Sequence, residues 1–176
     1  MGVGSGTVSR LVFGAGDVSV GGVDLGATDE GTVFRIEQEI YEPHFNGVYG
    51  PLRGSLHRTR LVAYIEVTVS EFSTDLLAIA IPGLISIESG AAPYSEELSD
   101  GLIACIADGE YQSVVWTGED CDGDDITITL ENAICTENME VTFQDTEEAK
   151  IRLVFMCTYD PADVGHIPFN VVVATS

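Results

Sequence analysis

Basic residues are scarce in this chain. Its 176 residues include seven Lys and Arg against 29 Asp and Glu, which gives a formal net charge of −22. The first 60 residues carry seven acids and five arginines (−2), and the remainder carries 22 acids and two bases (−20). A surface of that sign repels phosphate groups, so the composition argues against ordinary nucleic-acid binding.

Long hydrophobic runs are also absent. The most apolar stretch, residues 76–87, contains Pro82 and Gly83 and is well short of the roughly 20 residues that a membrane-spanning helix needs. The amino-terminal sequence Met-Gly-Val-Gly-Ser-Gly lacks the apolar core of a signal peptide. We therefore expect neither membrane insertion nor export by a cleaved signal.

Motifs of catalysis are missing as well. The chain has no Gly-x-Ser-x-Gly elbow, no His-Glu-x-x-His helix and no phosphate-binding Gly-rich loop. We therefore expect neither enzyme activity nor a cofactor. The three histidines are interpreted as exposed or hydrogen-bonded side chains: His44, His57 and His166.

The four cysteines form no Cys-x-x-Cys pair, which leaves a zinc site without local support. They are Cys105, Cys121, Cys135 and Cys157. Cys157 lies on an alternating apolar face, which predicts a small core residue. Cys121 and Cys135 bracket one predicted strand and could approach each other, but without a signal peptide we favour free thiols over a disulfide.

An acidic segment at residues 120–131 has part of the pattern of a calcium loop. Asp120, Asp122, Asp124 and Glu131 match loop positions 1, 3, 5 and 12. The glycine required at position 6 is Asp125, and residues 126–130 alternate with the period of a strand instead of a helix. We interpret the segment as an acidic turn that opens a strand, and as the place where a divalent ion would bind if any does.

The residues that are present favour a β-rich single domain over residues 1–176, with a flexible segment at 1–10. Val, Ile and Thr recur in alternating runs separated by turns, and the chain has 19 glycines. A helix is predicted within residues 70–81, capped by Ser70 or Ser73 and stopped by Pro82-Gly83. The predicted fold is an antiparallel β-sandwich or barrel with one flanking helix.

The predicted strands have one apolar and one hydrophilic face where they are longest. Residues 61–70 place Tyr64, Glu66 and Thr68 opposite an apolar face, and residues 32–41 place Arg35, Glu37 and Glu39 opposite another. Asp108-Gly109 predicts a hairpin turn. The full set of predicted strands is 11–13, 18–20, 32–41, 61–70, 84–88, 102–107, 111–117, 126–130, 139–144, 151–159 and 167–173.

Residues 43–60 form the most unusual segment. The segment has no periodicity and no acid, and it separates the two longest predicted strands. A loop of this length inside a domain is typically functional or disordered. Its arginines and large apolar residues favour an interface with another copy of the same acidic protein. They are Phe45, Val48, Tyr49, Leu52, Arg53, Arg58 and Arg60.

Several motifs in order resemble the tail tube proteins of long-tailed (siphovirus-like) phages and related tailed viruses. The first is Leu-Val-Phe-Gly-Ala-Gly-Asp-Val-Ser-Val-Gly-Gly-Val-Asp-Leu-Gly-Ala-Thr, and the second is Thr-Val-Phe-Arg-Ile-Glu-Gln-Glu before the Gly-rich loop. Arg-Leu-Val-Ala-Tyr-Ile-Glu-Val-Thr-Val-Ser-Glu-Phe then leads into the predicted helix and Ile81-Pro82-Gly83. The resemblance covers roughly residues 11–88.

The resemblance implies a small β-sandwich whose hexameric rings stack into a hollow tube, with the inner sheets joined into one barrel around the lumen. Residues 32–41 and 61–70 would line that lumen, presenting Arg35, Glu37, Glu39, Glu66 and Thr68, and residues 43–60 would contact the next ring. The implied partners are further copies of the chain and the tape-measure, tail terminator and baseplate or tail-tip proteins. DNA is implied only as transient, non-specific cargo, and the implied place is the virion tail, assembled in the host cytoplasm.

Two other interpretations remain open from the sequence. One is a tube subunit of a phage-like injection machine or gene-transfer particle, with the same fold and another cargo. The other is an acidic calcium-binding β-sandwich that acts in adhesion or carbohydrate binding.

Overall fold

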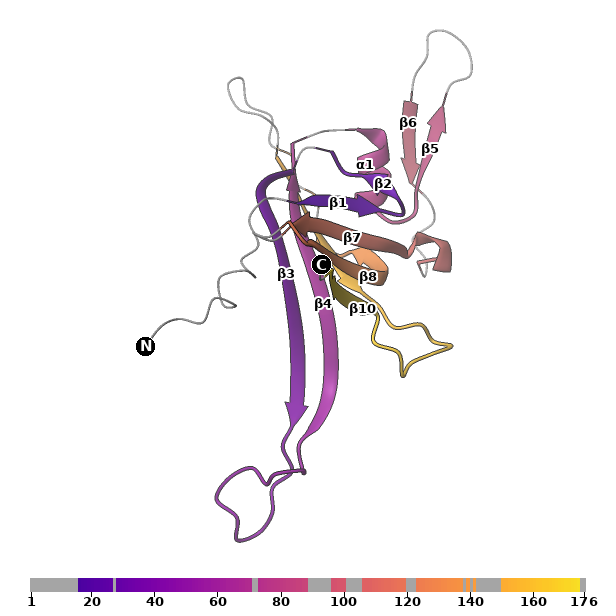
Figure 1. The fold of residues 1–176 in the computed structure, drawn as a ribbon. Coiled ribbons are helices and arrows are strands. Elements are labelled where there is room, and N and C mark those ends of the chain that lie inside the picture. The colour runs from indigo at the N-terminus through magenta and orange to yellow at the C-terminus, as the bar shows by residue number, and fades with distance from the viewer. Residues whose placement is uncertain are drawn as a thin grey trace.

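A computed structural model of the chain describes residues 16–26, 28–70, 73–88, 96–100, 106–119, 123–137, 139, 141 and 150–174. This part is mainly β, with an antiparallel eight-stranded sheet, a separate two-stranded sheet and one short α-helix (Figure 1). In chain order the elements are β1 (Asp17–Val20), β2 (Val23–Asp24), β3 (Thr28–Tyr41), β4 (His57–Val69), α1 (Thr74–Ala80), β5 (Leu84–Glu88), β6 (Glu96–Asp100), η1 (Asp108–Glu110), β7 (Gln112–Glu119), β8 (Asp125–Cys135), β9 (Ile151–Cys157) and β10 (Phe169–Val173).

Strand β8 joins the two halves of the large sheet, whose order is β2-β1-β7-β8-β9-β4-β3. The first part of β8 pairs with β7 and β10, Ala133 pairs with both β7 and β9, and Ile134 and Cys135 pair with β9. Asn132 separates these two parts and has a φ of 47°. A positive φ is uncommon for a residue other than glycine and marks a local break in the regular strand.

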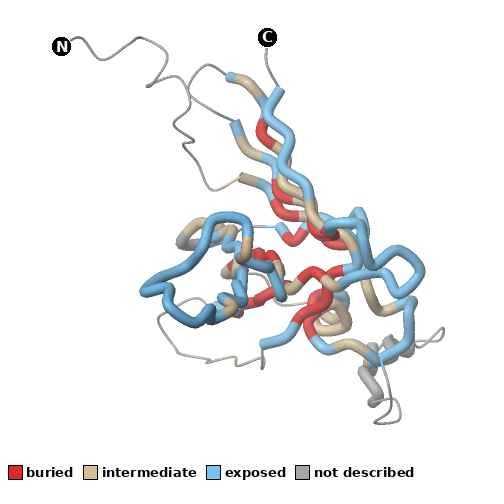
Figure 2. The backbone as a smooth tube through the Cα atoms, turned by 90° about the horizontal axis from the view of Figure 1, so that it is seen from below, coloured by how far each residue is buried: buried red, intermediate tan, exposed pale blue. Residues whose placement is uncertain are grey.

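The two halves pack on each other around one hydrophobic core. Val114 and Leu130 come from one half and Ile65 and Phe155 from the other, and all four are at most 1% exposed in a single buried cluster. Figure 2 shows the buried residues gathered in this body of the molecule. The predicted antiparallel β-sandwich or barrel with a flanking helix is therefore confirmed.

Helix α1 covers part of this core. Ser73 accepts a hydrogen bond from the Leu76 backbone N–H, which is the N-cap arrangement that the sequence predicts. Leu76 and Ala80 are buried, and the helix ends just before Pro82. No helix in the described ranges is long and apolar enough to cross a membrane.

Strands β3 and β4 form a hairpin that extends beyond the body (Figure 1). Their pairing runs from Thr28 opposite Val69 to Tyr41 opposite His57, with two register shifts. We call the part that leaves the body the arm. The predicted loop of residues 43–60 is too long, because residues 57–60 belong to β4. Both faces of the strand are solvated there, so no apolar alternation reveals it.

Other sequence predictions differ from the structure at the element ends. Asp108-Gly109 is part of a 3₁₀ turn, η1, instead of a hairpin between paired strands. Residues 106 and 107 are not in a strand, and neither are residues 139 and 141. The rest of predicted strands 102–107 and 139–144, the predicted strand 11–13 and the segment 1–10 lie outside the described residues.

Candidate functional site

One face of the arm and of β9 carries a series of ion pairs, and we call it the ion-paired face. Side chains alternate between the two faces of a strand, and directly opposed residues share a face. Arg35 is opposite Tyr64, Glu39 is opposite Arg60, and Thr68 is opposite Arg152. Their face is turned away from the core, to which the alternate residues Ile65 and Phe155 belong.

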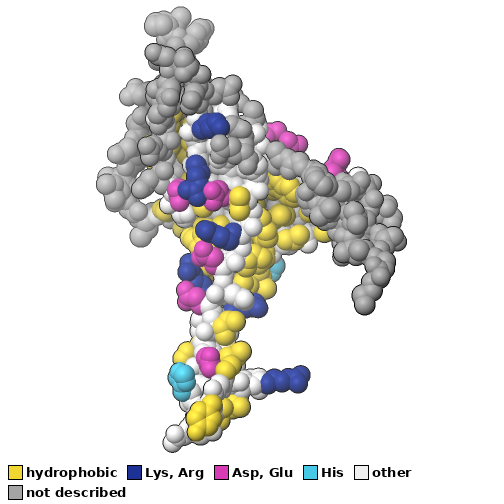
Figure 3. Space-filling model, turned by 90° about the vertical axis from the view of Figure 1, so that its left-hand side faces the viewer, with side chains coloured by type: hydrophobic (Ala, Val, Ile, Leu, Met, Phe, Trp, Pro, Cys, Tyr) yellow, Lys and Arg dark blue, Asp and Glu magenta, His cyan; other side chains and the backbone are white. Residues whose placement is uncertain are grey.

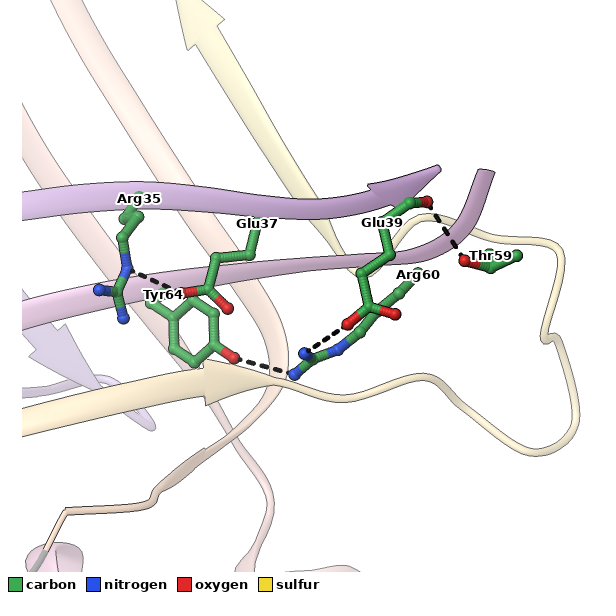
Figure 4. Close-up of polar contacts among 6 residues, drawn as sticks. All are labelled: Arg35, Glu37, Glu39, Thr59, Arg60 and Tyr64. Carbon is green, nitrogen blue, oxygen red and sulfur yellow. Dashed lines mark hydrogen bonds and ion pairs between the residues drawn. The ribbon is translucent and has the colours of Figure 1, made fainter. Parts of the chain in front are cut away.

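Polar contacts connect the two strands of the arm (Figure 4). Arg60 Nη1 lies 3.3 Å from Glu39 Oε1, and Arg60 Nη2 donates a hydrogen bond of 3.3 Å to the Tyr64 hydroxyl. The Arg35 guanidinium lies 4.8 Å from the centre of the Tyr64 ring and its Nε is 3.4 Å from Glu37. Each of these two arginines therefore has a carboxylate and an aromatic partner within the same chain.

Nearer the body, Arg152 bridges two acids. Its Nε lies 2.6 Å from Glu66 Oε1, and its Nη1 lies 3.4 Å from Glu137 Oε2. The hydrogen bond from Arg152 lowers the pKa of Glu66 below its ordinary value, with a further lowering from the charge of Arg152, while desolvation opposes both. Glu66 is therefore held in its charged form.

The structure brings all five residues predicted for a lumen onto this one face: Arg35, Glu37, Glu39, Glu66 and Thr68. Arg60, predicted for the loop, belongs to the same face, and sequence reasoning missed Arg152. The sequence signal that could have identified Arg152 as an outward-facing residue is the alternation of β9, in which Ile151 and Leu153 point inward. The described ion pairs thus set three arginines beside four carboxylates, so the face is closer to neutral than the sequence suggested.

The far end of the arm, residues 42–56, has a different character, and we call it the tip. Large apolar side chains are exposed there, and Tyr49 is completely exposed. Figure 3 shows acidic and basic side chains interleaved along the arm, and hydrophobic ones gathered at its end. The exposed hydrophobic residues of the tip are Phe45, Val48, Tyr49, Leu52 and Leu56.

Two hydrogen-bonded turns shape the tip. The Val48 N–H donates to the Phe45 carbonyl at 3.3 Å, and the Ser55 N–H donates to the Leu52 carbonyl at 3.1 Å. The third residues of these turns are Gly47 and Gly54, with φ values of 84° and 85°. A type II turn requires such a φ at that position, so glycine is needed at both sites. Arg53 is thereby presented at the corner of the second turn.

The three arginines predicted to act together are divided by the structure. Arg60 is ion-paired on the arm, Arg58 lies on β4 opposite Ile40, and Arg53 alone is in the tip. Within the described ranges neither Arg53 nor Arg58 lies in an ion pair. Phe45, Tyr49 and Leu52, which the sequence analysis assigns to the contact with the next ring, lie in the tip.

The candidate calcium ligands do not form a site among the residues that can be placed. Asp124 precedes β8, and Glu131 lies within it beside His166 at 3.0 Å. An extended strand separates the two acids by about 23 Å, which is too far to share an ion. Asp120 and Asp122 lie outside the described residues. No group of three potential ligands, His, Cys, Asp or Glu, was found in the described part of the chain.

The two cysteines that are described, Cys135 and Cys157, are buried free thiols. Cys157 is 2% exposed, which confirms its prediction as a core residue. Burial raises the pKa of both thiols, so they are neutral at ordinary pH. Cys105 and Cys121 lie outside the described residues.

Comparisons with known proteins do not assign this chain to a family. No family model and no curated protein matches the chain. A solved structure with a similar course of the chain is the cryo-EM structure of the anti-feeding prophage cap, a tube-terminating cap. It is 11% identical, the match covers 91% of this chain and 89% of that one, and the TM-score is 0.49.

Proposed function

We propose that this chain is a non-enzymatic structural subunit of a viral tail tube. Copies would close into hexameric rings, and the rings would stack into a hollow tube that conducts DNA from a capsid to a host cell. The observation that carries the proposal is the arm, which projects from the body and ends in a pre-shaped tip with exposed apolar side chains. The resemblance of residues 11–88 to tail tube proteins supports the same role.

The tip supports stacking because it offers a surface that only a partner can cover. Exposed apolar groups gathered at one place mark interaction sites. A contact between the tip of one copy and the body of another joins two different surfaces. Such a heterologous contact leaves a free tip and a free body at the two ends, so it repeats without limit. Stacked rings need this property.

Strand edges support closure of the ring. In the described sheet β3 pairs only with β4, although it is 14 residues long, and β10 pairs only with β8. Unpaired edges carry backbone donors and acceptors that favour pairing with another chain. Lateral pairing of such edges between neighbouring copies would continue the sheet around a ring.

The ion-paired face suits the wall of a conduit for DNA. A lumen that gripped phosphates would hold its cargo, because each uncompensated cation adds to affinity. Here Arg35, Arg60 and Arg152 all lie beside carboxylates of the same chain. We infer that the wall is non-adhesive because its cations are compensated, in addition to the net negative charge of the chain.

In this role the chain would assemble with the other components of a tail. Tape-measure, terminator and tail-tip or baseplate proteins are the proposed partners, the virion tail is the proposed location, and DNA passes only as transient cargo. A tube of an injection machine or gene-transfer particle would use the same surfaces with a different cargo. Analysis of the contents of isolated particles distinguishes these two uses.

Electron microscopy of the purified chain tests the proposal. Negatively stained samples over a range of protein and salt concentrations are expected to show rings or tubes with a central channel. Rings viewed end-on report closure, and tubes viewed from the side report stacking. A chain that stays monomeric at high concentration in every salt condition would overturn the proposal.

A further inference from the structure

A groove on the side of the body lies between η1, the bend of β8 and the segment after β9. Its volume is about 390 Å³, and its walls include Asp108, Tyr111, Asn132, Tyr159 and Asp160. None of these residues belongs to the ion-paired face or to the tip. The ion-paired face and the tip therefore do not account for this groove.

Hydrogen bonds fix the walls of the groove. The Tyr159 hydroxyl donates to the Leu61 carbonyl at 2.9 Å, which ties the groove to β4. The backbone N–H of Thr158 donates to the Asn132 carbonyl at 3.2 Å, and the Thr158 hydroxyl donates to the same oxygen. Asp160 Oδ1 accepts from the Ala162 N–H at 2.7 Å. The site is thus preformed, which reduces the entropic cost of binding.

The chemistry of the groove fits a guanidinium group. Two tyrosines line the groove, and their residue type can stack on a planar cation, while the two aspartates that line it supply counter-charge. Asp160 uses one oxygen for its own turn and retains the other. In the described part of the chain, no Lys or Arg forms an ion pair with Asp108 or Asp160.

The chain carries a matching group at the tip of the arm. Arg53 is displayed on a hydrogen-bonded turn and has no acidic partner among the described residues. It cannot fill the groove of its own molecule. The segment from Leu61 to His57 already extends about 13 Å away from the Tyr159 contact, and the tip lies further along the arm (Figure 1).

We propose that the groove receives the arm tip of a second copy of this chain, with Arg53 against the tyrosine rings and paired with Asp108 and Asp160. The inference rests on the proposed function, because it names the surface that the tip contacts in stacking. The contact is heterologous, so every copy has both a tip to give and a groove to fill.

Two single charge reversals test this pairing. Arg53→Glu disables the tip and Asp108→Arg disables the groove, and the Asp108 side chain has no described contact that folding would lose. Each change is expected to raise the protein concentration needed for stacking by on the order of tenfold or more, and the double variant to recover most of that loss. Tube length by electron microscopy and sedimentation are the measurements.

Mixing the two single variants gives a sharper test. The intact tip of D108R can enter the intact groove of R53E, and the acidic tip of R53E can enter the basic groove of D108R, which is the reversed pair that the double variant uses. The mixture should therefore stack at protein concentrations at which neither variant stacks alone, with the two variants alternating along the tube. Arg58→Glu and Asp163→Arg are matched controls, because both are exposed and lie outside the proposed contact.

The outcomes separate this inference from the proposed function. If R53E blocks stacking while D108R stacks normally, the tip contacts another surface and the groove assignment is wrong. The same holds if the mixed variants fail to stack with each other or if the double variant does not recover. If the wild-type chain forms paired or chained monomers through this contact but no rings, the groove assignment stands and the tube proposal fails.

Discussion

The base of the arm, which carries the ion-paired face, lies on β3 and β4, and the tip joins the ends of these strands, but the charges of the two regions are compensated in opposite ways. At the base, Arg35 and Arg60 lie beside Glu37 and Glu39, and the Tyr64 ring lies between the two arginines. At the tip, Arg53 has no described acidic partner and belongs to a segment with several exposed apolar residues. A surface that satisfies its charges internally needs no partner, whereas the tip gains from one.

The base and the tip differ in how their charges are compensated more than in how much they contribute to stability. Exposed ion pairs contribute about 0–1 kcal/mol each, because both side chains are solvated and lose entropy when they pair. The pairs at the base are at least partly exposed. Their main effect is therefore to keep the arginines from attracting anions. The tip differs, because two hydrogen-bonded turns shape it while Arg53 has no described acidic partner and large apolar side chains are exposed.

Removal of the tip should have the largest effect. We expect a variant with Asn-Gly in place of residues 42–56 to fold, because Tyr41 and His57 already face each other and Asn-Gly closes a two-residue hairpin. Its melting temperature should change little, since the tip contributes nothing to the buried core. Tubes should be absent in electron micrographs. Normal tubes from this variant would show that the tip is not the stacking contact.

Neutralising the acids of the base should convert it into a surface that binds DNA. In the triple variant Glu37→Gln, Glu39→Gln, Glu66→Gln the arginines lose their counter-charges. Duplex DNA should bind this variant more tightly than it binds the wild type at 50 mM salt. If three phosphates are contacted, the affinity should fall tens of fold between 50 and 200 mM salt. Fluorescence anisotropy with labelled DNA measures both.

The control for this variant has the same change in net charge elsewhere. Asp17→Asn, Glu119→Gln and Asp163→Asn remove three exposed acids from outside the ion-paired face. It should bind DNA no better than the wild type does at 50 mM salt. Equal gains in the two variants would mean that net charge, and not local compensation, keeps DNA away.

The sequence predicted the body better than the arm, for a physical reason. Residues 61–69 alternate because one face is buried in the core, and α1 has a cap and a stop that act locally. Beyond the body no burial enforces alternation, so residues 57–60 look like a loop although they pair with β3. Strand β6 could not be predicted from the sequence either, because its residues Glu-Glu-Leu-Ser-Asp are largely polar.

The candidate site was predictable as a face but not as a set of contacts. Alternation alone placed Arg35, Glu37 and Glu39 together. The partnership of Arg152 with Glu66 joins residues 86 positions apart in the chain, and it depends on the register of β4 with β9. Register is a property of the packed sheet that local sequence does not specify.

The energetic side of the comparison is measured by a double-mutant cycle at the base. Urea unfolding of Glu39→Gln, Arg60→Gln and the double variant should give a coupling energy of about 0.2–1 kcal/mol. Arg58→Gln is the matched control and should leave the free energy of unfolding nearly unchanged, because Arg58 has no ion pair in the described chain. A coupling above about 2 kcal/mol would mean that the base pairs are structural.

The smallest expected effect concerns acid. Arg152 lowers the pKa of Glu66 from its ordinary value of 4.5, so NMR titration should find Glu66 ionising below that value, and Arg152→Gln should move it back. A lowered pKa in the folded state stabilises the fold fully above 4.5, and this contribution disappears as the pH falls through the folded value. Glu66→Gln should therefore lose less stability than the wild type on acidification below about pH 4.5. A Glu66 that titrates at its ordinary value would mean that Arg152 does not compensate it in solution, and that this end of the ion-paired face resembles the tip.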